Sequence, residues 1–97
     1  MKASALHPLF GVAEAIHTYQ VPITQGGRAW TVEAWGEGRD DGRWEGWLVF
    51  VPADGSPPLA TPRETTQSNR QALVYWASGL APIYREGAFT RAIARAA

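Results

Sequence analysis

The chain has 97 residues, with nine basic and nine acidic side chains, no cysteine and 45% hydrophobic residues. This length fits one small globular domain over residues 1–97, and the lack of cysteine excludes disulfide bonds, thiolate zinc sites and cysteine nucleophiles. A net charge of zero argues against a protein whose main partner is a phosphate backbone. No segment approaches the ~20 apolar residues of a membrane span, so we expect no membrane partner.

The N-terminal segment is the first predicted element. Apolar residues at helical spacing, with Pro8 in the first turn, predict a short helix over residues 7–16. Its end, Ala13-Glu14-Ala15, imitates a signal-peptide cleavage site, but His7-Pro8 interrupts the apolar run that a signal peptide needs. We therefore expect residues 1–16 to form a helical or flexible arm and the protein to be cytoplasmic.

Three strands are predicted next along the chain. Alternating apolar residues over 19–24 predict a strand, which Pro22 places at a sheet edge because proline cannot donate to the hydrogen-bond ladder. Residues 29–36 and 43–51 predict two longer strands, joined by a polar turn that contains glycine. The strand over 43–51 is apolar on both faces, which is typical of a central strand.

The turn between the two long strands decides which side chains share a face. A two-residue turn at Asp41-Gly42 would pair Asp40 with Arg43 and so fix the register of the hairpin. In that register four large apolar side chains share one face: Trp35, Trp44, Leu48 and Phe50. A turn with an odd number of residues would exchange the partners, since a slip of one residue moves every side chain to the other face.

The rest of the chain predicts one more strand and two helices. Residues 59–66 are ambiguous, because Thr61 begins a capping-box pattern while the β-branched threonines favour the strand that we predict. A helix is predicted from Ser68 to a cap at Gly79, followed by a second helix with Pro82 in its first turn. The pattern predicts an α+β fold, with a small antiparallel sheet of three to four strands and one or two C-terminal helices packed on one face.

No motif in the sequence indicates catalysis or a cofactor. His7 and His17 are far apart, and only Glu14, one helical turn before His17, could join it as a weak metal pair. Asp40 and Asp41 suit the chemistry of a turn. The glycines lack the spacing of a dinucleotide loop, and no serine has the surroundings of a nucleophile. We therefore expect no enzyme, no cofactor and no metal site.

The predicted aromatic face gives the best indication of function. If the helices cover only the other side of the sheet, its four large apolar side chains form a patch that monomers rarely expose. Either residues 1–16 or the C-terminal helix cover the patch, or it is a homodimer interface, or it is a stacking platform for bases or a small aromatic ligand near Arg39 or Arg43. We expect a non-enzymatic interaction or regulatory module that forms a homodimer through this face.

The alternative function is binding of single-stranded nucleic acid by the aromatic face together with nearby arginines. Residues 61–97 hold five arginines and two acidic residues, so this part of the chain is basic. The candidate contacts are Arg39, Arg43, Arg85, Arg91 and Arg95. The negative end of a helix dipole would explain Arg91 and Arg95 without any partner.

Overall fold

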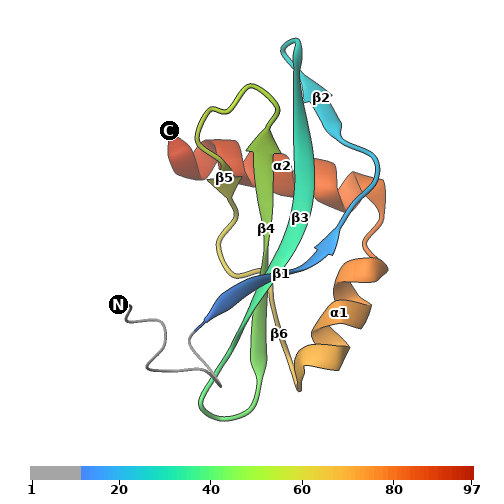
Figure 1. The fold of residues 1–97 in the computed structure, drawn as a ribbon, viewed down its shortest axis with the longest axis vertical. Coiled ribbons are helices and arrows are strands. Elements are labelled where there is room, and N and C mark those ends of the chain that lie inside the picture. The colour runs from blue at the N-terminus through green and yellow to red at the C-terminus, as the bar shows by residue number, and fades with distance from the viewer. Residues whose placement is uncertain (1–11) are drawn as a thin grey trace.

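The computed structural model describes residues 12–97 as an antiparallel sheet with two helices packed on it (Figure 1). The strands are β1 (Ala13–Thr18), β2 (Ile23–Gln25), β3 (Arg28–Gly38), β4 (Trp44–Pro52), β5 (Leu59–Ala60) and β6 (Thr65–Gln67), and the helices are α1 (Arg70–Ser78) and α2 (Pro82–Ala96). The predicted α+β class is confirmed. The sheet is larger than we predicted, because six strands take part.

The two long strands form the centre of the sheet. The strand order is β1-β3-β4-β5, while β2 pairs with the first residues of β3 and β6 pairs with the first residues of β4. Short strands therefore flank β3 and β4 on both sides, and the predicted central position of the strand over 43–51 is confirmed.

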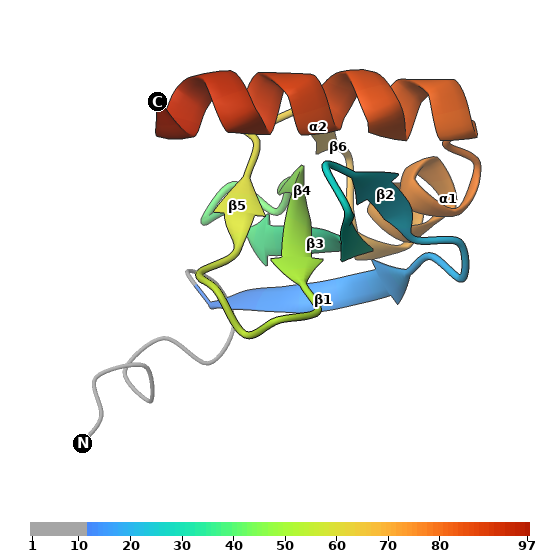
Figure 2. The same cartoon turned by 90° about the horizontal axis from the view of Figure 1, so that it is seen from above.

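Both helices pack on the same face of the sheet, as predicted. Figure 2 shows α2 lying across the sheet with α1 beside it. The ring of Phe89 on α2 meets those of Trp30 and Phe50 edge to face, each with 5.1 Å between ring centroids. Leu73 of α1 is fully buried among the strands. This face holds the hydrophobic core, and no helix within residues 12–97 lies on the opposite face of the sheet.

The register of the β3–β4 hairpin differs from the predicted one by one residue. Arg39 donates its N–H to the Arg43 carbonyl over 2.7 Å, so the loop contains three residues, 40–42. Gly42 takes a positive φ of 88°, a conformation that three-residue hairpin loops favour and that glycine adopts easily. The odd loop length exchanges the cross-strand partners, and Trp35 consequently lies opposite Trp47.

A pair of glycines makes room for α1 on the core face. Gly36 of β3 lies directly opposite Gly46 of β4, and the two methyl groups of Leu73 enter the space above them. A side chain at either glycine would collide with Leu73. Farther along, the Trp44 ring lies over Gly38, its cross-strand partner, and covers its backbone. The small residues thus let the first helix approach the sheet closely.

The predicted helix over residues 7–16 is wrong for the residues that the structure describes. Residues 13–18 form β1, which pairs with β3 and contains an irregularity between Ala15 and His17. Pairing with β3 satisfies the backbone groups that face β3, and Glu14 binds Arg70 of α1 over 2.8 Å, so tertiary contacts override the weak helical spacing. The earlier part of the predicted helix lies outside the described residues.

The segment that we predicted as one strand over 59–66 forms two short strands, β5 and β6, with a break between them. At the break Thr61 is buried, and its hydroxyl accepts the Leu48 N–H over 3.1 Å. Helix α1 then begins at Arg70 with Asn69 as its cap, two residues later than predicted, and Gly79 ends it as expected. Helix α2 runs on through Gly87 without a break.

Candidate functional site

The face of the sheet opposite the two helices is the candidate functional site, and we call it the open face. Its side chains alternate with the core residues along β3 and β4. They are Thr31, Glu33, Trp35 and Glu37 on β3 and Glu45, Trp47, Val49 and Val51 on β4. Ala15 of β1 flanks Trp35 on one side, and Ala60 of β5 flanks Val49 on the other.

Two tryptophans occupy the middle of the open face. Trp35 and Trp47 are direct cross-strand partners, and the indole N–H of Trp35 donates to the Glu33 carboxylate over 2.8 Å. Trp35, Val49 and Val51 are half-buried, although neither α1 nor α2 covers them. The centre of the open face is therefore an apolar strip of Trp35, Trp47, Val49 and Val51, with Glu33 beside Trp35 and with Glu37 and Glu45 at the hairpin end.

Arg63 covers one side of the Trp47 ring. Its guanidinium carbon lies 4.0 Å from the ring centroid, a distance at which a cation and an aromatic face attract each other. Glu37 and Glu45 hold the same guanidinium over 2.8 and 3.2 Å. Trp47 is only 9% exposed as a result, and the charges at this end of the open face are neutralised within the chain.

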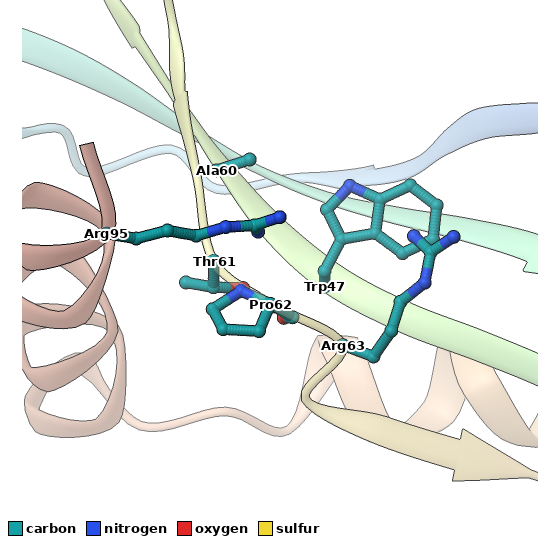
Figure 3. Close-up of a pocket in the computed structure, with 6 residues that line it drawn as sticks. All are labelled: Trp47, Ala60, Thr61, Pro62, Arg63 and Arg95. Carbon is teal, nitrogen blue, oxygen red and sulfur yellow. The ribbon is translucent and has the colours of Figure 1, made fainter.

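A pocket of about 460 Å³ lies beside Trp47, where the end of α2 comes close to the chain between β5 and β6 (Figure 3). It is lined by Trp47, Ala60, Thr61, Pro62, Arg63 and Arg95. Figure 3 shows the Arg95 side chain reaching from α2 toward Ala60 and the indole. Arg95 has no ion pair within residues 12–97. Because none of the six lining residues is acidic, the pocket suits a carboxylate or another anionic acceptor.

The four residues that we predicted as one exposed patch do not share a face. Leu48 and Phe50 are fully buried in the core, and Trp44 lies over Gly38 on the side of the helices. Only Trp35 belongs to the open face. The cause is the three-residue loop, which moves every β4 side chain to the face opposite the predicted one.

Four of the five arginines that we predicted as nucleic-acid contacts are engaged within the chain. Arg39 and Arg43 bind carboxylates of the hairpin, with shortest distances of 3.0 and 3.6 Å. Arg85 donates to the Leu80 carbonyl over 2.9 Å, and Arg91 binds a carboxylate over 2.6 Å. Only Arg95 keeps its guanidinium unpaired among the described residues. Nothing in this arrangement favours nucleic-acid binding, which stays a prediction.

Two tyrosines connect the helices to the rest of the fold. The Tyr84 hydroxyl donates to the Glu64 carboxylate over 2.6 Å, and burial together with that carboxylate raises the pKa of Tyr84 to about 12. The Tyr19 hydroxyl donates to the Ala77 carbonyl over 2.6 Å, and burial raises the pKa of Tyr19 to about 12. These contacts hold α1 and α2 in place and are structural.

The residues with metal-ligating side chains do not gather into a site. Glu14 is occupied by Arg70, and the His17 ring packs against Tyr19 with 4.6 Å between centroids. Within residues 12–97 no three histidine or carboxylate side chains come together in a way that could hold a metal ion, and His7 lies outside this range. None of the helices described here is long and apolar enough to cross a membrane.

Sequence reasoning missed the partners that shape the open face. Arg63 and Trp47 are 16 positions apart, and Arg95 reaches the same pocket from the end of the chain. One signal in the sequence could have placed Glu33 and Trp47 on the same face. Only the observed register puts all the glutamates of the two hairpin strands on one face, and Trp47 lies on that face. Comparison of this chain with protein-family models, with curated proteins and with solved structures found no match.

Proposed function

We propose that this protein is a non-enzymatic interaction module that self-associates through its open face. The supporting observation concerns Trp35-Gly36 on β3 and Gly46-Trp47 on β4, where tryptophan lies opposite tryptophan and glycine opposite glycine. In both, the glycine faces α1 and the indole faces away from the helices. The chain thus places two of its five tryptophans, Trp35 and Trp47, on the face opposite α1 and α2, and such side chains are concentrated in the centres of protein interfaces.

The edges of the sheet support a contact through the face instead of through strand pairing. β1 is interrupted by its irregularity after Ala15, and Pro22 precedes the short strand β2. On the other side, β5 and β6 contain only two and three residues. Bulges, prolines and very short strands are devices that prevent edge-to-edge pairing.

The distribution of charge favours a second copy of this chain as the partner. Glu33 has no ion pair within residues 12–97, and it lies on the β3 side of the apolar strip. Arg95, also unpaired there, reaches the pocket on the β5 side. One face with an acidic side and a basic side can be complementary to itself, as a symmetric dimer requires.

The test is the molar mass in solution, measured by light scattering on a sizing column over a wide concentration range. We expect a species of twice the 10.6 kDa chain mass. Trp35→Ala should weaken association by about 2 kcal/mol, or ~30-fold in Kd, because a central aromatic residue of an interface contributes on that order.

Tyr75→Ala is the matched control for this test. Tyr75 is 81% exposed on α1, so the variant also loses an exposed aromatic ring but leaves the open face unchanged. We expect its association to equal that of the wild type. A wild-type chain that stays monomeric at every concentration would contradict the proposal, and so would equal association of the Trp35 variant and the wild type.

A further inference from the structure

Three open-face positions lie in one row across the sheet. Glu33 of β3 is the partner of Val49 on β4, and Val49 is in turn the partner of Ala60 on β5. Neighbouring strands are ~4.8 Å apart, so Val49 lies midway between the acidic position and the basic side of the open face. Arg95 extends to that basic side, as Figure 3 shows.

This row determines how two open faces can meet with their charges matched. When two copies meet face to face, their two-fold axis lies in the plane of the interface. Rotation about this axis places each side of one open face against the opposite side of the other. If the axis follows β4, Val49 and Val51 of the two copies lie against each other. The β3 side of each copy then covers the β5 side of the other, and the strands of the two sheets stay aligned, as in packed β-sandwiches.

We infer that the dimer has its two-fold axis along β4 and that the Glu33 carboxylate of each copy binds the Arg95 guanidinium of the other. The carboxylate enters the pocket beside Trp47, which holds no acid of its own. In the same arrangement the Trp35 ring meets Pro62 on the far side of the axis. This inference rests on the proposed self-association, and it adds the arrangement of the copies and the residues that fix it.

Charge exchange tests the pairing directly. Glu33→Arg and Arg95→Glu should each weaken self-association about a hundredfold, since symmetry repeats the pair and each lost pair costs about tenfold. The double variant should recover a dimer, because it exchanges the two charges and so restores an attractive pair at each end of the interface. Each single variant alone would pair like charges at both ends of the interface. An equimolar mixture of the two should form a heterodimer, because both of its pairs then join an arginine to a glutamate.

A second mixture controls for attraction between chains of opposite net charge. Glu86 is exposed on α2, on the helix side of the molecule, and Glu86→Arg changes the net charge by the same amount as Glu33→Arg. Mixed with Arg95→Glu, the Glu86 variant restores only one of the two pairs, so its heterodimer should be about tenfold weaker than the heterodimer of Glu33→Arg with Arg95→Glu. Circular dichroism and thermal unfolding show whether each variant is folded. If a charge reversal unfolds the chain, Glu33→Gln and Arg95→Gln replace it. We expect about tenfold weakening from each, because glutamine still hydrogen-bonds the remaining charged partner at both ends of the interface.

The outcomes separate this inference from the proposed function. A monomeric wild type overturns both. A wild-type dimer that Trp35→Ala weakens, but that Glu33→Arg and Arg95→Glu leave unchanged, supports the open face as the interface and overturns the pairing. Loss of the dimer in both single variants without recovery in the double variant overturns the pairing as well. Recovery in the double variant supports the axis along β4.

Discussion

Alanine at either glycine of the Gly36–Gly46 pair should destabilise the fold, although alanine is a small residue. The new Cβ at Gly46 would lie 2.5 Å from a Leu73 methyl carbon, and the Cβ at Gly36 would overlap the other methyl. Leu73 is fully buried, so it has little room to move. Either the leucine must leave its position or α1 must move away from the sheet.

The expected size of the effect follows from two opposing contributions. Overpacking a core costs about 1–3 kcal/mol. Replacing glycine restricts the unfolded chain and returns about 0.4–1 kcal/mol. We therefore expect a net loss of about 1–2 kcal/mol for Gly46→Ala, and each kcal/mol lowers Tm by ~4–8 °C in a domain of this size. Leu73→Ala alone should cost about 2–5 kcal/mol, because it leaves a cavity.

A double-mutant cycle identifies the cause. In the Leu73→Ala background the methyl groups are absent, so Gly46→Ala should cost nothing or stabilise the chain. The measurement is thermal and urea unfolding at one fixed protein concentration, because self-association would add to the apparent stability. Gly87→Ala is the matched control, since its Cβ meets nothing closer than 3.6 Å inside α2 and should stabilise by about 0.5–1 kcal/mol. Equal costs of Gly46→Ala in both backgrounds would refute this explanation.

Three further predictions concern contacts within the fold. The pKa values of Tyr19 and Tyr84 are raised from 10.0 to about 12, so between pH 10 and pH 12 the folded state binds more protons than the unfolded state. The free energy of unfolding should therefore fall as the pH rises from 10 to 12. Urea unfolding over that range measures this, and a flat profile would contradict it. Glu64→Gln should lower the pKa of Tyr84, because it removes the negative charge beside the hydroxyl. The absorbance of tyrosinate as a function of pH measures this pKa, and an unchanged titration would argue against the contact. Thr61→Val should lower the free energy of unfolding by about 1–3 kcal/mol, because it leaves the buried Leu48 N–H without its acceptor. Thr61→Ser keeps the hydroxyl and should lower it less. Equal unfolding midpoints for the two variants would count against this role.

The elements of this fold follow from the sequence more readily than their register. The two long strands and both C-terminal helices were predictable from alternation, capping residues and the position of Pro82. The hairpin loop was not, because Asp41-Gly42 suits a two-residue turn as well as the last two positions of a three-residue loop. The residues of the turn are thus compatible with two registers, which place each β4 side chain on opposite faces of the sheet.

Charge placement along the strands could have decided between the two registers. The predicted register sets Glu45 opposite Gly38, on the face of Val32 and Ala34 that would form the core, whereas the observed one sets Glu33, Glu37 and Glu45 together on the open face. It also brings Gly36 opposite Gly46, which leaves space for a helix. Burying a carboxylate without a partner is costly, so the acidic residues of a hairpin are a better guide to its register than the turn alone.

The short strands were beyond local reasoning. β1 pairs with the far half of β3, and its Glu14 binds an arginine at the start of α1, 56 positions away. The spacing of Ala13 and Ile16 fits a helix equally well, so only the long-range pairing decides the outcome. The same is true of Arg95, whose place near the open face depends on where α2 crosses the sheet.

The position of the two glycines ties the fold to the proposed function. Because Gly36 and Gly46 face α1, their neighbours Trp35 and Trp47 must face the other way, since adjacent residues of a strand point to opposite faces. The close approach of α1 and the aromatic centre of the open face are thus two results of one pattern. Trp47 is only 9% exposed in the single chain, whereas the half-buried Trp35 gains full burial only against a second surface. Substitutions at the glycines should therefore change stability, whereas Trp35→Ala should change association much more than stability.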